Sequence, residues 1–246
     1  MLYFFVFLGG ILSGFINVNA GGGSLITLPL LNFLGLPLDV ANGTNRIGIL
    51  FQNVTSVSKF KKEKVLDFKR ALFLAIPTTI GAILGSNLVV EIDKDMLKPI
   101  VGIILLIMSV FIIWKPKVWV EQKDVKANNF VSFIVFFAIG IYGGFLQAGV
   151  GFFFIIALVM LEGYDLLKTN AIKVFLVMVY TAFSLLIFAL NGKVDLIAGL
   201  FLAAGSSLGA YFGSKFAIKR GSNWIRFIVF AMVIISAIVY LVQSFT

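Results

Sequence analysis

The sequence predicts an all-α integral membrane protein with about ten hydrophobic segments, arranged as two inverted-topology repeats of five. Three observations predict this fold class. The 246 residues are 60% hydrophobic with a mean hydropathy of +1.07, which is more apolar than a soluble domain of this length requires. Stretches of the two halves match at a nearly constant offset, and the basic residues gather in a few loops between apolar segments.

The apolar segments set the expected helices. In chain order they are 2–17, 24–35, 44–58, 71–90, 97–114, 129–147, 150–161, 170–190, 196–214 and 224–242. Several reach the ~20 residues that a helix needs to span a bilayer. The segments 24–35 and 150–161 are short, so each is either a half-helix or a re-entrant segment. No basic residue precedes Arg46, so we expect the first segment to be a retained span and not a signal peptide.

A polar stretch, 115–129, divides the chain into a first repeat, 1–119, and a second repeat, 120–246. Each repeat is expected to contain one broken or re-entrant helix, at 10–31 and at 140–161. At an offset of 130, Gly10, Ile11, Gly14, Phe15 and Gly21 match Gly140, Ile141, Gly144, Phe145 and Gly151, and Asn17 falls on Gln147. Broken helices at matching places in two halves are typical of a transporter's binding site.

The repeat continues beyond the broken helices. Thr44-Asn45 matches Thr169-Asn170 at an offset of 125, and 78–86 matches 206–214 at an offset of 128. The last pair of stretches carries a GxxxG pattern in each copy, Gly81/Gly85 and Gly209/Gly213, which lets two helix backbones approach closely in lipid. This pattern by itself predicts helix packing, and its repetition at one offset supports duplication.

Charge placement predicts the topology. The loops 59–70, 115–126 and 215–226 hold 14 of the 20 basic residues, whereas 91–98 and 191–195 hold few. The positive-inside rule therefore places the three basic loops in the cytoplasm and the other two outside. Matching loops of the two halves then lie on opposite sides, which makes the repeat an inverted one. We expect a multi-pass protein of the cell (inner) membrane with both termini external.

The two broken stretches supply the first candidate substrate-binding residues. They are Asn17, Asn19, Gly21, Gly22, Gly23 and Ser24 in the first half, and Gln147, Gly149 and Gly151 in the second. A helix that begins near Ser24 would point its positive end into the membrane, where it suits an anion. The alternative is a glycine-lined packing surface with amides bonded across helices.

A second group of candidates opens the third segment of each half: Thr44, Asn45 and Arg46, and Thr169, Asn170 and Lys173. A hydroxyl and an amide at a helix start can simply cap the helix. A cation inside an apolar segment either faces a water-filled cavity or snorkels to the interface. If Arg46 and Lys173 face one cavity, the substrate is an anion.

The composition also excludes several kinds of function. The chain has no Cys and no His, which excludes disulfides, thiolate chemistry and Cys/His metal sites. The carboxylates are few and lie near segment ends, which disfavours a cation substrate or a carboxylate proton relay. We expect no catalytic residues, no metal and no cofactor, so the protein is not expected to be an enzyme. The expected partners are a small anion and the lipid bilayer but no nucleic acid, and a homo-oligomer is compatible with the sequence.

The chain resembles the sulfite exporter TauE/SafE family of membrane permeases. The resemblance covers nearly the whole chain and rests on the GGGS stretch followed by Pro29 and Leu31, on Ala41-x-Gly43-Thr44-Asn45 after Gly35, and on the repeated GxxxG spans. The second copy has Phe152 and Phe153 where the first has Gly22 and Gly23, and the family typically has Thr-Ser at the two Thr-Asn pairs.

The resemblance implies an inverted two-half permease for sulfur-containing anions or small organic acids, usually moved outward. We therefore expect a secondary transporter that moves a small anion by alternating access, with sulfite or an organosulfonate favoured. A passive anion channel and a transporter of small organic carboxylates are the alternatives.

Overall fold

The computed structural model describes residues 2–88, 125 and 128–244, and all of its regular elements are helices. They are α1 (Leu2–Asn19), α2 (Ser24–Phe33), α3 (Leu38–Lys62), α4 (Phe68–Leu88), α7 (Asn129–Phe145), α8 (Val150–Glu162), α9 (Leu166–Leu190) and α10 (Leu196–Ser244). The predicted segment 97–114, the loop 91–98 and nearly all of the linker 115–126 lie outside the described residues. The all-α prediction is confirmed for the described part of the chain.

Four of these helices are long and apolar enough to cross a membrane: α1, α4, α9 and the part of α10 from Leu196 to Ala231. The half-helices α2 and α8 have 10 and 13 residues. At 1.5 Å per residue they reach only about 15 and 20 Å, less than the ~30 Å of a bilayer core. Neither helix can span the bilayer alone. The two predicted interruptions are therefore present, one between α1 and α2 and one between α7 and α8.

Two other boundaries differ from the prediction. The predicted basic loop 215–226 is helical except at Gly221, where φ is 71° and ψ is −172° and two helices meet within α10. The predicted division between the segments 196–214 and 224–242 is therefore present, but as a kink at one residue and not as a loop. Lysine, arginine and alanine are good helix formers, so the charges of this stretch did not require a loop. Helices α3 and α9 begin six and four residues before the apolar segments that predicted them, and each has one charged residue in its first turn, Asp39 and Lys168.

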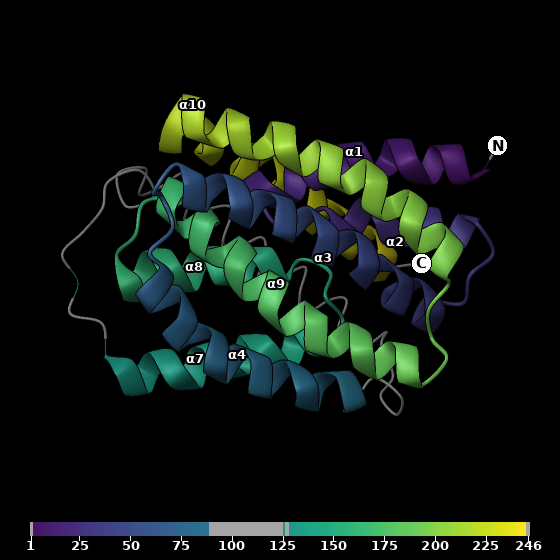
Figure 1. Ribbon diagram of the computed structural model, residues 1–246, viewed down its shortest axis with the longest axis horizontal. Coiled ribbons are helices and arrows are strands. Elements are labelled where there is room, and N and C mark those ends of the chain that lie inside the picture. The colour runs from purple at the N-terminus through teal and green to yellow at the C-terminus, as the bar shows by residue number, and fades with distance from the viewer. Residues whose placement is uncertain (1, 89–124, 126–127, 245–246) are drawn as a thin grey trace.

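The helices form three layers, with α1 and α10 on one side, α4 and α7 on the other, and α3 and α9 between them (Figure 1). The central pair is the most enclosed, because residues 41–49 of α3 and 169–177 of α9 are all buried. A helix that is buried on every side at its middle must satisfy any polar side chain there within the protein.

Glycines hold the two outer pairs together. A Cβ atom added at Gly14 of α1 would collide with the backbone of Ser206 in α10, and one added at Gly144 of α7 would collide with the backbone of Ala82 in α4. Gly85 and Gly209 likewise face the backbone of Ile141 and Ile11. Both GxxxG patterns therefore serve helix packing, as predicted.

The two outer pairs run parallel. Along α1, Tyr3 stacks on Phe201 and Phe15 lies against Phe216 of α10, so both helices advance in the same direction. In the other pair, Gly140 faces Thr78 and Gly144 faces Ala82. The central helices run antiparallel, because the first turn of α3 meets the chain just after α9 through a 2.7 Å ion pair between Asp39 and Lys193.

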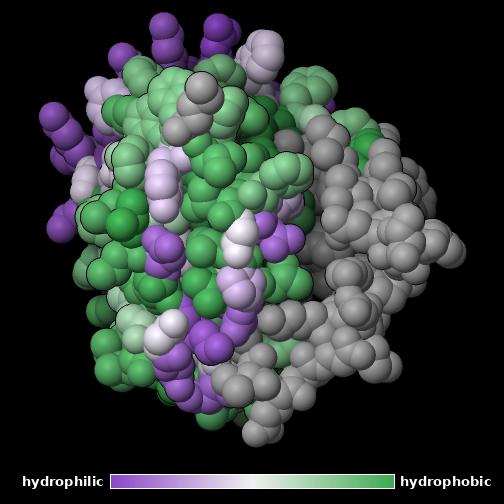
Figure 2. Space-filling view, turned by 90° about the vertical axis from the view of Figure 1, so that its right-hand side faces the viewer, coloured by the Kyte–Doolittle hydropathy of each residue, from purple (hydrophilic) through white to green (hydrophobic). Residues whose placement is uncertain are grey.

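The bundle has one strongly basic end. There the start of α4 meets the start of α9 through a 2.7 Å hydrogen bond from the Tyr164 hydroxyl to Asp67, and the N–H of Leu167 donates to Ser222 beside the α10 kink. The basic stretches 59–70 and 215–226 therefore share this end, while 191–195 lies at the other. On the face seen in Figure 2 hydrophobic residues dominate, and hydrophilic residues form a central stripe and an upper rim.

We expect Gly85→Leu to reduce the thermal stability of the purified protein strongly. The new side chain would have to displace the backbone of α7 at Ile141, and overpacking of a tight contact costs about 1–3 kcal/mol or more. Thermal unfolding in detergent measures the effect. The matched control is Ile76→Leu on the same helix, whose side chain is exposed and whose substitution should leave the melting temperature unchanged.

Candidate functional site

The two interruptions, residues 20–23 between α1 and α2 and residues 146–149 between α7 and α8, are called the breaks. They meet in the middle of the protein. A Cβ atom built on Gly151 would lie 2.8 Å from the carbonyl oxygen of Gly21, and one built on Gly21 would lie 2.7 Å from the carbonyl carbon of Gly151. Gly21 has a φ of +87° and Gly149 a φ of +73°, which glycine adopts without strain. Gln147 takes a φ of +64° although it has a side chain, and such strain is often found at functional sites. The structure thus brings the two candidate stretches together.

The end of α1 lies inside the protein, so its last carbonyl groups need donors. These groups belong to Ile16, Asn17, Val18 and Asn19. The first accepts from the N–H of Ala20, and the ammonium of Lys173 donates to the next two at 3.1 and 2.9 Å. The last accepts from the amide of Asn170 at 3.0 Å. Every terminal carbonyl of α1 is satisfied, three of them by α9.

The end of α7 is treated in the same way by α3. Its last carbonyl groups belong to Tyr142, Gly143, Gly144 and Phe145. The first accepts from the N–H of Leu146, and the guanidinium of Arg46 donates to the next two at 3.4 and 2.5 Å. The amide of Asn42 donates to the last at 3.0 Å.

The capping is reciprocal between the two halves. A cation and an amide on α3 hold the broken helix of the second half, and a cation and an amide on α9 hold that of the first. A helix carries a negative partial charge at its C-terminal end, so a buried cation there is favourable. Arg46 is 0% and Lys173 2% exposed, so neither side chain snorkels to the membrane interface, and that alternative is wrong.

The starts of α2 and α8 differ from the ends of α1 and α7, because several of their backbone N–H groups are not capped by a described residue. The backbone N–H groups of Gly22, Gly23 and Ser24, and those of Gly149 and Gly151, make no hydrogen bond to another described residue. The first turn of α2 is instead fixed through its side chains, because Asn45 accepts from Thr27 at 2.6 Å and donates to Ser24 at 3.1 Å. The main-chain carbonyls at the ends of α1 and α7 are therefore satisfied, whereas those main-chain N–H groups at the starts of α2 and α8 are not used by another described residue.

Two of the predicted residues point elsewhere. The hydroxyl of Thr44 accepts from the N–H of Asp195 at 2.8 Å, and that of Thr169 lies 3.5 Å from the carbonyl of Tyr164. Both residues sit inside their helices, so the interpretation that they cap helix starts is wrong. The cap of α9 is Asp165, which accepts from the N–H of Lys168.

The remaining predicted residues lie at the breaks. Asn17 contributes its backbone carbonyl to Lys173 and is only partly buried. The amide of Asn19 donates to Phe15 and Gly213, and its Oδ1 atom has no partner among the described residues. Gln147 accepts from Arg46 at 2.7 Å and donates to Thr181 at 3.3 Å.

The sequence analysis missed Asn42, Thr27 and Thr181, which complete the central network. Asn42, Asn45 and Arg46 have helical spacing on one face of α3, and a polar face in the middle of a membrane helix could have identified Asn42. The contribution of Thr181 depends on the conformation of Gln147, and the sequence carried no signal for it.

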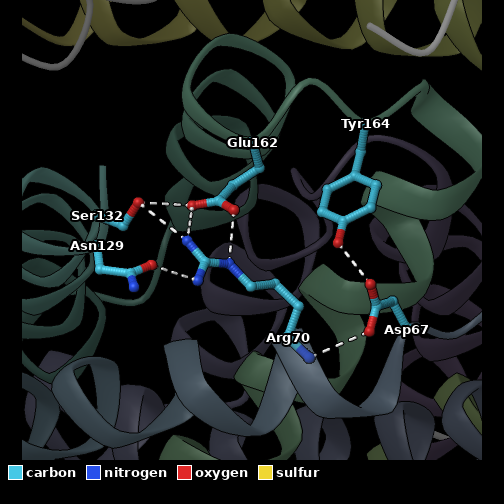
Figure 3. A network of polar contacts seen from close by, with 6 residues as sticks. All are labelled: Asp67, Arg70, Asn129, Ser132, Glu162 and Tyr164. Carbon is cyan, nitrogen blue, oxygen red and sulfur yellow. Dashed lines mark hydrogen bonds and ion pairs between the residues drawn. The ribbon is translucent and has the colours of Figure 1, made fainter. Parts of the chain in front are cut away.

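The carboxylates that the structure describes lie away from this centre. Glu162, at the end of α8, forms a two-point ion pair with Arg70 of α4, with Nε–Oε2 at 2.7 Å and Nη2–Oε1 at 2.9 Å (Figure 3). Ser132 donates to the same carboxylate at 2.6 Å, and Asn129 accepts from Arg70. This group fastens the C-terminal end of α8 to α4 and α7 at the basic end. Burial, together with a hydrogen bond to Asp67, raises the pKa of the nearby Tyr164 hydroxyl.

We expect Arg70→Met to destabilise the protein by about 3 kcal/mol, because it leaves the buried Glu162 carboxylate without its cation. The double variant Arg70→Met/Glu162→Leu removes both charges and should recover most of the loss. Unfolding of both variants in detergent measures this difference. Equal stability of the two variants would show that the loss in Arg70→Met does not come from an unpaired Glu162 carboxylate.

Comparisons with known proteins point to membrane transporters. The family model described as "Sulfite exporter TauE/SafE" matches residues 6–240. The chain is 30% identical to "Probable membrane transporter protein ORF9" of Sinorhizobium sp, over 90% of this chain and 85% of the relative. It is 29% identical to "Probable membrane transporter protein YfcA" of Escherichia coli strain K12, over 95% and 86%, and 28% identical to a "Probable membrane transporter protein" of Haemophilus influenzae, over 92% and 89%. No solved structure matches the chain.

Proposed function

Because the chain belongs to the sulfite exporter TauE/SafE family of membrane transporters, we propose that it is a secondary transporter for a small oxyanion. The favoured substrate is a sulfur-containing anion such as sulfite or an organosulfonate, moved by alternating access. The proposed binding residues are those at the breaks, above all the glycines and the start of α2, with the buried cations beside them.

One observation carries the proposal. At the centre of the protein the terminal carbonyls of α1 and α7 are all satisfied, whereas N–H groups at the starts of α2 and α8 make no hydrogen bond to another described residue. Two positive helix ends and two buried cations therefore converge where the described carboxylates are absent. An oxyanion supplies only acceptors and negative charge, which suits the unused main-chain N–H groups at these two helix starts.

The inverted repeat, with halves 1–119 and 120–246, is part of the proposal. The direction of the described helices supports it: α1 begins at the end of the bundle that holds 191–195, and its counterpart α7 begins at the basic end beside Arg70. Helices α3 and α9, which also match between the two halves, likewise run in opposite directions. A site at the junction of such halves is typical of transporters.

A screen of ligands tests the substrate. Purified protein is titrated with sulfite, thiosulfate, a sulfonate and small carboxylates, and stabilisation by sulfite or a sulfonate is the expected result. Stronger stabilisation by a carboxylate would instead favour a transporter of small organic carboxylates. Counter-gradient, saturable flux in liposomes is expected of a carrier, whereas purely downhill flux at far higher rates would favour the passive channel.

The proposed topology gives a prediction that the absence of native cysteine makes easy to check. Cysteine at Lys62 or Lys219 should react with a membrane-impermeant maleimide only from the cytoplasm, because positive loops stay inside. Cysteine at Asn191 should react only from outside, as should one added at the N-terminus. Labelling of positions 62 and 191 from the same side would rule out the inverted arrangement.

A further inference from the structure

We infer that the two buried cations have different tasks: Arg46 contacts the anion directly and sets its binding geometry, whereas Lys173 is a positioning residue that acts through the end of α1. The inference rests on the proposed function, since it assumes an anion at the breaks. It follows from counting which donors of each side chain are already in use.

Lys173 has no donor left. An ammonium group has three hydrogens, and here they go to the carbonyls of Asn17 and Val18 and to the side-chain oxygen of Asn170 at 2.7 Å. An anion could be contacted by Lys173 only if one of these bonds broke. The positive charge of Lys173 therefore offsets the negative end of α1 and keeps the first break in place.

Arg46 keeps two donors. Its Nη1 atom serves Gly143 and Gln147, and its Nη2 atom serves Gly144 with one of two hydrogens. Its Nε atom is buried and has no partner within the described part of the chain. The unused groups, Nε–H and one Nη2–H, are of the same kind as those through which Arg70 holds both oxygens of the Glu162 carboxylate.

The guanidinium is also held in a fixed orientation. Phe188 lies under it, with 4.4 Å from Cζ to the ring centroid, and the strained Gln147 binds Nη1 at 2.7 Å. A planar fork held this way recognises an anion through two oxygens, which a lysine cannot do. The geometry thus points to a substrate that offers two oxygens on one atom, a description that covers sulfite, sulfonates and carboxylates.

The test exchanges the two cations in the full-length protein, with sulfite as the probe. Arg46→Lys keeps the charge but loses the fork, and it should raise the Kd for sulfite by about tenfold or more. Lys173→Arg keeps the charge and the cap, and its Kd should stay within about threefold of the wild type, since no substrate bond is lost. Thermal unfolding without ligand shows whether each variant is folded.

A second matched pair leaves both cations in place. Gln147→Ala frees the Arg46 guanidinium and should weaken sulfite binding about as much as Arg46→Lys does. Asn170→Ala removes a cap of α1 and should lower the melting temperature while changing the Kd less than threefold. Unchanged affinity in Arg46→Lys, or equal losses in Arg46→Lys and Lys173→Arg, would overturn the division of tasks. A wild-type protein that binds none of the test anions would instead overturn the proposed function.

Discussion

A Gly151→Leu protein is expected to insert into the membrane and to lose at least about 99% of its transport activity. Any side chain at this position meets the backbone of Gly21, with the carbonyl oxygen 2.8 Å from the new Cβ atom. The two breaks would have to move apart, and displacements of about 1 Å at a site are enough to cost two orders of magnitude in rate. Gly151 has an ordinary backbone conformation, so the effect would come from lost space and not from backbone strain.

Two controls separate this effect from general damage. Gly149→Ala is strained at a φ of +73° but meets only Phe152 at 3.7 Å, so it tests strain without a clash. Gly85→Leu clashes outside the breaks and should reduce the amount of folded protein, as a packing defect does. Flux is measured in liposomes and normalised to protein that a cysteine label shows to be inserted. Normal flux from Gly151→Leu would assign the glycines to packing and remove the breaks from the transport path.

The broken helices could be predicted because their cause is local. Glycines that cluster with amides within an apolar run are typical of a broken membrane helix, and the repetition of Gly21 as Gly151 and of Asn17 as Gln147 marked both places. The helix-packing role of the GxxxG pairs is similarly written in the spacing of small residues.

Helix boundaries were less accurate for a physical reason. An uninterrupted apolar run marks only the middle of these helices, whereas the first turns of α3 and α9 lie at the ends of the bundle and each include a charged residue, Asp39 and Lys168. Thr44 and Asn45 were consequently placed at a helix start. The Pro37-Leu38-Asp39 stretch contained a better start signal, because proline and an acidic residue are favoured there.

The reciprocal caps could not be predicted from the sequence. Arg46 is separated by 98 positions from Gly144, and Lys173 by 155 from Val18. The sequence shows that two cations lie inside apolar segments and that two helices end early. Which cation serves which helix end depends on the crossing of α3 and α9, and this crossing is a property of the packed helices.

Neutralising the buried cations is expected to weaken anion binding, and Arg46→Gln should do so more than Lys173→Gln. Arg46→Gln removes two caps of α7 and the unused donors of the guanidinium, so we expect a loss of about 1.5–3 kcal/mol, or roughly ten- to a hundredfold in Kd. Lys173→Gln leaves the carbonyls of Asn17 and Val18 without their cation, which restores the negative end of α1 beside the anion. Compared with Arg46→Gln, Lys173→Gln should change the Kd less and should lower the stability by a similar amount.

The control makes the same chemical change away from the breaks. Lys193→Gln removes an exposed lysine that pairs with Asp39, and pairs of this kind contribute about 0–1 kcal/mol to stability. Its Kd for sulfite should equal that of the wild type. Calorimetric titration of all three variants with sulfite, at constant ionic strength, provides the comparison. If both Arg46→Gln and Lys173→Gln bound sulfite like the wild type, the buried charges would have no part in recognition. Selectivity for anions would then depend on the N–H groups at the starts of α2 and α8 alone.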